Sequence, residues 1–343
     1  MKLHAQNPPH IRTRESNSTF MTDAIIATLP LYAMATYFYG TRVLIIAALS
    51  VLITVLIDAF CQMLRRSVPN IRDGSAIVTG LIIPLLMPAS ARIETVAVAA
   101  IFAITVVKHP FGGAGHNIFN PAAAGVAFAT VCWPKRMFMY PIPFDQLPLK
   151  IDGSVKLITA PAHTLALGGV PTTDMLDMLL GNFPGPMGAT NILVLCTCLL
   201  FLVVRKTIAL STTVSFLAGY ALIAWSAPRA VITPMQSVLL ETMSGLTLFG
   251  AIFLINDPVT SPKRRLPRIA YGFFTGMLCM YFRHIGRYEE SFLFALLIMN
   301  AAVWLFDLWG EYLNHILRRK KVEHKTNQAL SQETDDNLGT DQE

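Results

Sequence analysis

The chain has 343 residues, of which 53% are hydrophobic and only 14% charged, with a formal net charge of +6 and a mean hydropathy of +0.51. Soluble domains carry about 25% charged residues, so this composition excludes a soluble globular protein and indicates an integral membrane protein. The basic residues lie between apolar runs, where they fix topology, and we expect no nucleic-acid surface. Residues 1–23 are polar and are expected to form a cytoplasmic N-terminal segment without a signal peptide.

Ten apolar segments follow in chain order. They cover residues 24–39, 43–64, 76–87, 93–107, 118–133, 191–204, 210–226, 246–256, 269–283 and 291–309. Several are shorter than the roughly 20 residues that a full crossing needs. We interpret 76–87 and 246–256 as broken or half helices, which survive at membrane depth only inside protein or beside a cavity. The expected fold is an all-α transmembrane domain over residues 24–317.

The lysines and arginines predict the topology. If the N-terminus is cytoplasmic, the cytoplasmic segments hold 18 of the 27 lysines and arginines. This bias places both termini in the cytoplasm and the long 134–190 connection, which ends at Thr190, on the periplasmic side. Residues 318–343 form a cytoplasmic tail. After Lys325 the tail is polar, acidic and without apolar periodicity, which predicts disorder.

A weak internal repeat lies in the third and eighth apolar segments. Gly80 and Pro88 enclose seven residues, as do Gly250 and Pro258. Because the two segments are five apart, the second copy is inverted relative to the first. This pattern predicts two inverted five-helix repeats with interrupted helices, as in transporter folds. A chance recurrence of Gly and Pro, which are frequent in membrane helices, is the alternative.

The five cysteines do not form a metal-binding motif. They are Cys61, Cys132, Cys196, Cys198 and Cys279, and no two are spaced as C-x-x-C. Cys196 and Cys198 are separated by about 200° on a helix. We therefore expect no iron–sulfur or zinc site in this chain and interpret the cysteines as buried apolar residues. Nucleophilic triads and Walker loops are also absent from the sequence, so no catalytic residue is assigned.

A Gly-rich segment from Lys108 to Pro121 is the first candidate site. Its three glycines allow backbone to approach a ligand closely. Asn117 and Asn120 are three residues apart and are expected to share one face at the start of the next helix, where their amides suit a planar heteroaromatic ring with carbonyl and imide edges. A Gly-rich turn followed by an Asn-Pro helix entry explains the same residues without a ligand. His109 and His116 are candidate proton carriers or metal ligands, although a loop histidine is usually neither.

Three acidic residues in or near apolar segments are further candidates. Asp257, in the sequence NDPVTSP (256–262), is costly at the end of an apolar run unless it is paired or faces water. It can accept a ligand hydrogen bond, help to bind a cation or simply end the segment. Asp58 and Asp307 are candidates for ion translocation, but each lies close to one end of its segment.

The tripeptide Gly188-Ala189-Thr190 precedes the apolar run 191–204 and follows a connection rich in Pro and Gly. One interpretation makes Thr190 the N-cap of the next helix. The other makes its hydroxyl, on mobile backbone at a membrane surface, the target of a modifying enzyme. The local sequence leaves both interpretations open, and they do not exclude each other.

Three segments together resemble a known family. The segments GGAGHNIFNPAAAG (112–125), GATNILVL (188–195) and NDPVTSP (256–262) are similar to the D subunit of the Rnf ion-translocating oxidoreductase complex. That protein is a sister of the B subunit of the sodium-translocating NADH:quinone reductase. The resemblance extends from about residue 20 to 317, with the same order of segments and the same number of spans.

The resemblance implies cofactors. Thr190, with Gly188 and Ala189 before it, would carry FMN through a phosphoester bond made by a dedicated flavin transferase. The family motif more often has Ser or Thr before the glycine, where this chain has Met187. In the sister protein, the positions that match Asn117, Asn120 and Asp257 contact a second, non-covalent flavin, riboflavin.

The resemblance also implies a function. The chain would be a flavoprotein subunit of a bacterial inner-membrane translocase that couples NADH and ferredoxin redox chemistry to Na⁺ or H⁺ movement, inactive alone. The expected partners are the other subunits, including an FMN-carrying G-type subunit and iron–sulfur subunits, together with the flavin transferase and membrane lipid. A small-solute channel or secondary transporter is the alternative, and a structural membrane scaffold is a third. The sequence leaves open the ion and the direction of electron flow.

Overall fold

The computed structural model describes residues 17–66, 73–113, 115–149, 151, 155–286 and 290–340. For residues 17, 18 and 317–340 only the backbone is described. Most of the expected N-terminal segment, parts of the 134–190 connection and the last three residues of the tail lie outside the described residues.

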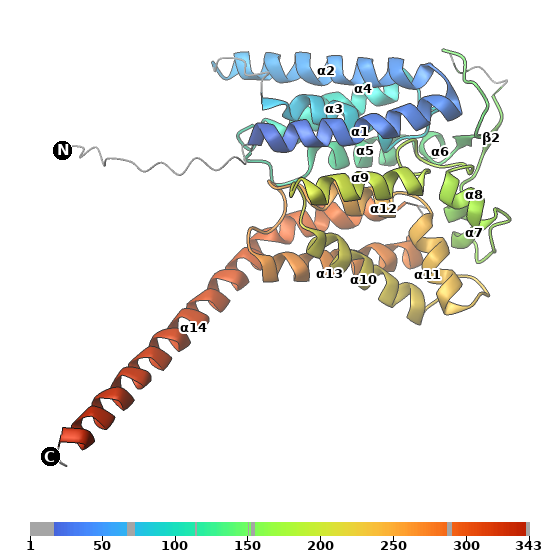
Figure 1. Ribbon diagram of the computed structural model, residues 1–343. Helices are drawn as coiled ribbons and strands as arrows, with labels where there is room; N and C mark the ends of the chain where they lie inside the picture. The colour runs from blue at the N-terminus through green and yellow to red at the C-terminus, as the bar shows by residue number, and fades with distance from the viewer. Residues whose placement is uncertain are drawn as a thin grey trace.

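The described part is a bundle of helices with one small sheet (Figure 1). In chain order the helices are α1 (Asn17–Tyr39), α2 (Arg42–Leu64), α3 (Ser75–Leu85), α4 (Ile93–Phe102) with its π-helical continuation η2 (Ala103–Lys108), α5 (Pro121–Cys132), α6 (Pro134–Met137), α7 (Pro161–Ala166), α8 (Met175–Leu180), α9 (Ile192–Val204), α10 (Leu210–Ser226), α11 (Pro234–Met243), α12 (Thr247–Phe249) with its π-helical continuation η3 (Gly250–Leu254), α13 (Arg265–Ile285) and α14 (Phe292–Thr340). Strands β1 (Tyr140–Pro141) and β2 (Leu157–Ile158) pair antiparallel.

Helices occupy all ten apolar ranges expected from the sequence. Among the described residues, α2 and the Phe292–Ile316 part of α14 are long and apolar enough to cross a membrane. The pair formed by α11 and α12–η3 meets the same test as one broken span, with a bend of 71°. The bend lies directly before the eighth apolar segment, so that segment forms the second half of the bent pair. Ten crossings and an inverted repeat stay predictions.

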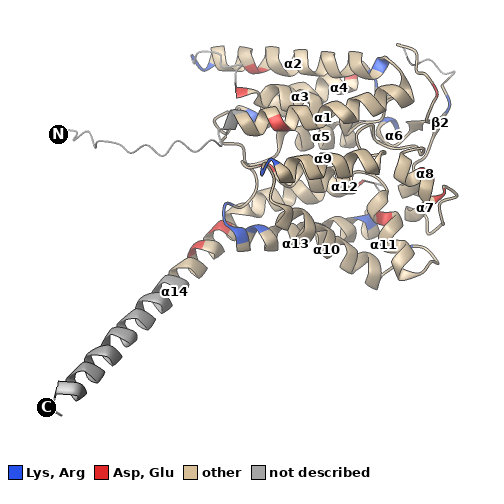
Figure 2. Cartoon of the chain, viewed as in Figure 1, with Lys and Arg blue, Asp and Glu red and all other residues tan. Residues whose placement is uncertain are grey.

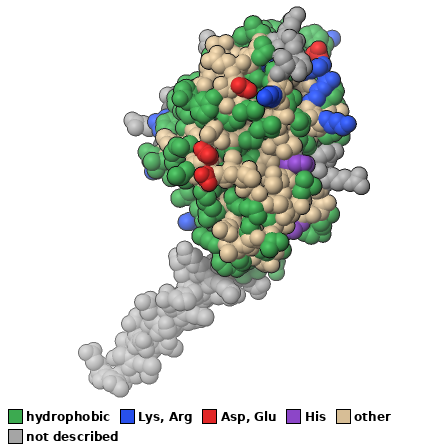
Figure 3. All heavy atoms as spheres, turned by 90° about the vertical axis from the view of Figure 1, so that its right-hand side faces the viewer, with side chains coloured by type: hydrophobic (Ala, Val, Ile, Leu, Met, Phe, Trp, Pro, Cys, Tyr) green, Lys and Arg blue, Asp and Glu red, His purple; other side chains and the backbone are tan. Residues whose placement is uncertain are grey.

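The long helices lie side by side, so the bundle has two ends (Figure 1). The short helices α6, α7 and α8 lie at one end, which we call the Thr190 end because Thr190 precedes α9 there. Helix α14 leaves the bundle at the opposite end, which we call the cleft end after the cleft described below. Most Lys and Arg residues lie near helix ends rather than along the helices (Figure 2). Seen from the Thr190 end, apolar side chains cover much of the surface and charged ones are scattered among them (Figure 3).

Small residues let two of the helices pack closely. Gly219 of α10 and Gly272 and Gly276 of α13 lie so near the opposite backbone that a Cβ at any of them would collide with it. Such contacts are typical of helix pairs in membranes, where small residues permit close packing. On α2 the buried face includes Ser50, Thr54 and Asp58 at helical spacing. This spacing turns the Asp58 carboxylate toward the bundle interior.

Several boundaries differ from the sequence expectation. Helix α1 begins at Asn17 rather than at residue 24, and α5 begins at Pro121 rather than at 118. Helix α11 is not anticipated by the apolar pattern. The backbone of α14 is helical to Thr340 and so includes most of the tail, for which the sequence predicts disorder.

Candidate functional site

A cleft opens at the cleft end of the bundle. Its walls are mainly apolar, and its lining includes Val78, Ile82, Leu202, Ile252 and Phe253 together with the polar residues Ser75, Thr79, Lys108, Asn117, Asn120, Thr207 and Asp257. The enclosed part of the cleft has a volume of about 70 Å³, and the empty space reaches about 830 Å³ when the open solvent at its mouth is included. Apolar walls with a few convergent polar groups are typical of a binding site for a small organic molecule.

Asn120 and Asp257 meet in this cleft although 137 residues separate them in the chain. The Nδ2 of Asn120 donates to Oδ2 of Asp257 at 3.0 Å. The Oδ1 of Asn120 accepts from the backbone N–H of Ala123 at 3.1 Å and so caps α5, with Pro121 in the first helical position. The expected Asn-Pro helix entry is confirmed, and the same residue also belongs to the cleft.

The Asp257 carboxylate is half-buried and has three hydrogen-bond donors. Its Oδ1 accepts from the backbone N–H of Val259 at 3.1 Å, and its Oδ2 accepts from the hydroxyl of Thr260 at 3.2 Å as well as from Asn120. Burial raises the pKa of Asp257, and these hydrogen bonds oppose that rise. The carboxyl group is therefore held in a fixed orientation in the cleft wall.

Asn117 lies in the loop before α5 and not on the helix. The expectation that Asn117 and Asn120 share one helical face is therefore wrong, because the Asn120 cap starts the helix at Pro121. Asn117 nevertheless lines the cleft, and its Oδ1 is buried without a hydrogen-bond partner. A buried acceptor of this kind needs a donor. Asn117 Oδ1 is thus suited to accept from an N–H group of a ligand.

The Gly-rich segment forms a turn that only glycine adopts easily. Gly112, Gly113 and Gly115 have φ angles of +126°, +93° and +87°. The turn interpretation is therefore confirmed. Gly115 also lines the cleft, and a Cβ at this position would meet no atom within 4 Å. Its backbone is consequently open to a ligand.

Lys108 lines the cleft, and the sequence analysis includes it as the first residue of the Gly-rich segment without giving its side chain a role. It is the last residue of η2, and the next backbone N–H, that of His109, donates to the carbonyl of Ile104 at 3.1 Å in the π-helical pattern. Such π-helical turns are frequent at functional sites. The signal that could have identified Lys108 is a cation placed between an apolar run and a Gly-rich turn.

At the Thr190 end, the segment before α9 is docked on α3. The backbone N–H of Met187 donates to the carbonyl of Met87 at 3.0 Å, and that of Gly188 donates to the carbonyl of Leu85 at 2.8 Å. A Cβ on Gly188 would lie 2.7 Å from the Leu85 side chain and 2.9 Å from the Phe249 ring. Gly188 is therefore required by close packing, whatever else the segment binds.

Helix α9 begins after Thr190 and is capped by its neighbour. The Oδ1 of Asn191 accepts from the backbone N–H of Val194 at 3.0 Å, and its Nδ2 donates to the carbonyl of Leu180 at 2.8 Å. The interpretation of Thr190 as the N-cap is therefore wrong, because Asn191, an equally good capping residue, holds that position. The Thr190 side chain is 2% exposed, and its hydroxyl forms no hydrogen bond with another described residue.

Packed side chains connect the two ends. Phe249, which contacts Gly188, stacks on Phe253 with ring centroids 4.8 Å apart, and Phe253 lines the cleft. Helix α9 also connects them, since it runs from Asn191 to Leu202 in the cleft wall, a rise of about 17 Å at 1.5 Å per residue. The Thr190 segment and the cleft are thus separate sites joined through one protein core.

Comparison with known proteins assigns the family. The model for the NQR2, RnfD, RnfE family matches residues 4–312. This chain belongs to that family. The resemblance expected from the three sequence segments is therefore confirmed.

Relatives in the family carry informative names. The chain is 30% identical to the D subunit of the Na⁺-translocating ferredoxin:NAD⁺ oxidoreductase complex of Acetobacterium woodii, over 90% of this chain and 93% of that protein. It is 30% identical to the D subunit of the ion-translocating oxidoreductase complex of Pseudomonas aeruginosa, over 90% and 94%. It is 28% identical to the D subunit of the proton-translocating ferredoxin:NAD⁺ oxidoreductase complex of Clostridium ljungdahlii, over 91% and 95%.

Other sequence candidates in this family member have local roles. Asp307 accepts from the backbone N–H of Lys263 at 3.1 Å and so anchors the loop before α13. His116 packs beside Gly112 and does not line the cleft. Cys198 is buried and Cys196 is exposed, in agreement with their different helical faces. Cys132 is also exposed, so the expectation that all five cysteines are buried is wrong.

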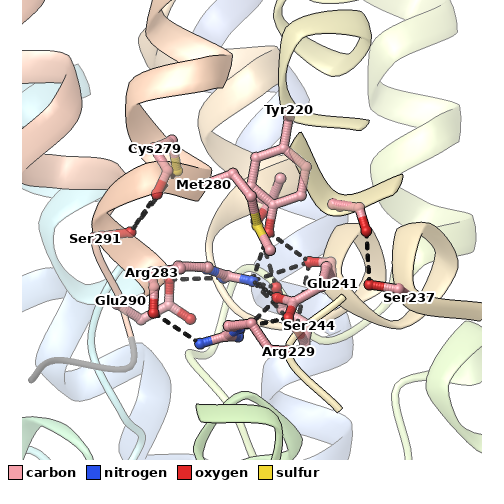
Figure 4. Close-up of polar contacts among 12 residues, drawn as sticks. Tyr220, Arg229, Ser237, Glu241, Ser244, Cys279, Met280, Arg283, Glu290 and Ser291 are labelled. Carbon is pink, nitrogen blue, oxygen red and sulfur yellow. Dashed lines mark hydrogen bonds and ion pairs between the residues drawn. The ribbon is translucent and has the colours of Figure 1, made fainter. Parts of the chain in front are cut away.

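The Thr190 end contains a second feature that the sequence does not signal, a closed charge cluster made by Arg229, Glu241, Arg283 and Glu290 (Figure 4). Arg283 donates to Glu241 at 2.9 Å, and Arg229 donates to both Glu241 oxygens at 2.7 and 2.8 Å. Glu290 accepts from the backbone N–H of Leu246 at 3.0 Å. Because Leu246 lies between α11 and α12, the cluster fixes the bend in the broken helix.

Proposed function

We propose that this chain is the flavin-carrying membrane subunit of an ion-translocating ferredoxin:NAD⁺ oxidoreductase complex. It passes electrons through a covalent FMN on Thr190 and a non-covalent riboflavin in the cleft. Family membership and the names of three relatives support the complex. Two of these relatives are named for different ions, Na⁺ and H⁺, so similarity does not assign the ion. Activity requires the partner subunits, which supply the iron–sulfur centres and the further FMN.

The observation that carries the flavin assignment is the Thr190 hydroxyl, which is free of the capping role that Asn191 performs. Attachment uses a flavin dinucleotide as donor: the Oγ–H and P–O–P bonds break, an Oγ–P bond to the FMN phosphate forms, and the nucleoside monophosphate leaves with the proton. Thr190 lies directly before the first turn of α9, where free backbone N–H groups and the helix dipole favour a phosphate. Because the residue is buried, the flavin transferase reaches it only while the segment before α9 is undocked from α3. In this proposal that segment is periplasmic in a bacterial inner membrane.

The cleft supports the second flavin. Asn117 Oδ1 provides an acceptor for the imide N–H, and the open backbone of Gly115 permits close approach. Apolar side chains such as Ile252 and Phe253 form the walls against which ring faces pack. A bound flavin supplies the redox chemistry, while the chain supplies orientation and electrostatics. The Phe249–Phe253 stack leads from this cleft toward the Thr190 segment.

Fluorescence of the denatured chain tests the covalent assignment. The chain is co-expressed with its flavin transferase, purified and run on a denaturing gel under ultraviolet light. We expect a fluorescent band that is lost in Thr190→Ala and kept in Thr197→Ala, a matched control on the exposed face of α9. Thr190→Ser keeps a hydroxyl and should keep the band. A colourless wild-type band, with the transferase shown to be active on another substrate, would refute the covalent flavin.

A small-solute channel or secondary transporter is the second candidate function. The 71° bend between α11 and α12 favours it, because discontinuous helices commonly line transport sites. Solute uptake by vesicles that contain only the colourless chain would favour this alternative. Flavin bound at both sites would favour the first proposal.

A further inference from the structure

One wall of the cleft borders a buried network of three titratable side chains. Asp58 of α2, Lys108 of η2 and the adjacent His109 are between 2% and 9% exposed. The Nζ of Lys108 lies 2.8 Å from Oδ1 of Asp58, and Nε2 of His109 lies 2.9 Å from the same oxygen. One carboxylate oxygen therefore joins a lysine and a histidine.

Only one of the three residues lines the cleft. Lys108 does so, and its Nζ also donates to the hydroxyl of Ser75 at 2.7 Å, which lines the cleft as well. Asp58 lies behind Lys108, and its second oxygen accepts from Gln62 at 2.7 Å. The network thus runs from the cleft wall toward the side of the bundle formed by α2.

His109 is the outer member of the network. Its carbonyl accepts from the guanidinium of the exposed Arg65 at 3.3 Å, and the next residues along the chain, Pro110 and Phe111, are exposed. The Nδ1 atom of His109 is buried without a hydrogen-bond partner. This nitrogen is the one polar atom of the three side chains with neither a partner nor free access to solvent, so it needs a water or a proton.

We propose that His109, Asp58 and Lys108 form a proton relay that delivers protons from the surface near Arg65 to a redox-active ligand in the cleft. This inference rests on the proposed function, which supplies the ligand and its electrons. Histidine suits the outer position, because one ring nitrogen can accept a proton while the other releases one. Lysine suits the inner position, because an ammonium group both donates a proton and compensates added negative charge.

Each transfer conserves protons and electrons. When one electron enters the cleft ligand from a redox partner, Lys108 Nζ releases one proton to the ligand. Asp58 Oδ1 then passes a proton from His109 Nε2 to the neutral Lys108 amine, since both nitrogens contact that oxygen. His109 takes up one solvent proton at Nδ1 as it gives up the proton at Nε2, which leaves the Nδ1–H tautomer. A flip of the imidazole ring returns that proton to the side of Asp58 before the next transfer. The net change is one electron and one solvent proton added to the ligand.

Other titratable groups near the network are few among the described residues. Cys61 and Arg65 lie on α2, and Asp73 accepts from the backbone N–H of Ser75 at the start of α3. Across the cleft, the Asp257 oxygens are occupied by Asn120, Val259 and Thr260. None of these carboxylates pairs with Lys108, so Asp58 is the acid through which the lysine exchanges protons.

The test follows proton uptake when the cleft flavin is reduced. The chain carries Thr190→Ala, so that added riboflavin is the only flavin, and is held in detergent with a pH-indicator dye. Pre-reduced methyl viologen, a one-electron donor that releases no proton when it is oxidised, reduces the flavin. The reduction is followed by the loss of flavin absorbance, in H₂O and in D₂O and from pH 6 to pH 8. In the Thr190→Ala chain that keeps Lys108, we expect proton uptake to occur at the same rate as flavin reduction. Both rates should be slower in D₂O than in H₂O.

Variants then separate a relay from a structural ion pair. Lys108→Met and His109→Gln should each slow proton-coupled reduction by about 100-fold, the scale of general acid catalysis. In a third variant, His109→Gly, added imidazole should restore part of the reduction rate. Lys263→Met, an exposed lysine outside the cleft, is the matched control. If a single variant does not fold, the double variant Asp58→Asn/Lys108→Met replaces it. The double variant removes both charges of the pair and therefore leaves no unpaired buried ion.

The outcomes distinguish the two proposals. Variants that bind riboflavin and reduce it at the wild-type rate would overturn the relay alone. Wild-type reduction without proton uptake or an isotope effect would do the same, even if every variant failed to fold. A wild-type chain that binds no riboflavin in this cleft would overturn both the relay and the second-flavin assignment.

Discussion

The two ends of the bundle bury charge in different ways. At the Thr190 end, the closed charge cluster has two arginines and two glutamates, with each side chain at most 6% exposed. At the cleft end, Asp58 is paired with Lys108 and His109, and the lysine lines a cleft. The first group contains only arginines and glutamates, whereas the second includes a histidine, which has two ring nitrogens that can each carry a proton.

This difference separates a structural network from one suited to chemistry. The closed charge cluster joins α11 and α13 around the bend at Leu246, and none of its four residues lines the cleft. Its charges cancel, and its bonds determine where the broken helix turns. The Asp58 network instead borders the cleft and contains a buried nitrogen without a partner. Burial and ion pairing are common to both networks and therefore do not distinguish them. The feature that distinguishes the Asp58 network is its position beside a cleft.

The largest effect is expected from breaking the closed charge cluster. Arg283→Met leaves Glu241 and Glu290 buried without their shared cation and should reduce the free energy of unfolding by about 3–5 kcal/mol. Thermal unfolding of the purified chain in detergent measures the change. Arg136→Met, at an exposed arginine of α6, is the control and should leave the transition unchanged. If the Arg283→Met chain were as stable as wild type, the result would show that the cluster does not stabilise the fold.

A smaller loss of stability is expected at the cleft end. Lys108→Met leaves Asp58 with two donors, His109 and Gln62, so the free energy of unfolding should fall by only about 1–3 kcal/mol. The same thermal unfolding experiment compares the two ends directly. If Lys108→Met destabilised the chain more than Arg283→Met, the contrast between the two networks would be reversed.

A third effect concerns ligand binding rather than stability. Asp257→Asn replaces the carboxylate that accepts from Asn120 and should weaken riboflavin binding about tenfold, or about 1.4 kcal/mol. Quenching of riboflavin fluorescence on titration with the chain measures the affinity. Asp145→Asn changes an exposed acid on the connection after α6 and should bind riboflavin normally. Equal affinity in the two variants would exclude Asp257 from the site.

The smallest effect separates capping from cofactor attachment at the Thr190 end. Asn191→Ala removes the cap of α9 and should cost about 1 kcal/mol of stability while the covalent fluorescence persists. Thr190→Ala should have the reverse outcome, with fluorescence lost and stability nearly unchanged. If Thr190→Ala lost stability and Asn191→Ala did not, the result would show that Thr190 has the structural role.

Local chemistry made much of the fold predictable from the sequence. Apolar runs located the ten helical ranges, and the Asn120-Pro121 pair indicated where α5 begins. Helix α11 could also have been recognised, because Thr233 and Gln236 form a capping box around Pro234. The N-cap at Asn191 was not separable from Thr190, since adjacent Thr and Asn residues are both good caps.

Contacts between distant segments were not predictable in the same way. The family resemblance places Asn120 and Asp257 at one cofactor, but their hydrogen bond was not predicted, because nothing in local spacing joins residues so far apart. The role of Lys108 depends on Asp58 from another helix, and the closed charge cluster combines residues from two helices and two loops. Such networks arise from packing and leave no periodic pattern in one sequence.

Helix α3 has a mechanical consequence for the two sites. Its first residue, Ser75, accepts the Lys108 hydrogen bond, and the carbonyls of Leu85 and Met87 at its far end accept from Gly188 and Met187. The helix is about 16 Å long and acts as a stiff rod between two contacts. One short helix therefore contacts both the Lys108 network and the segment that carries Thr190.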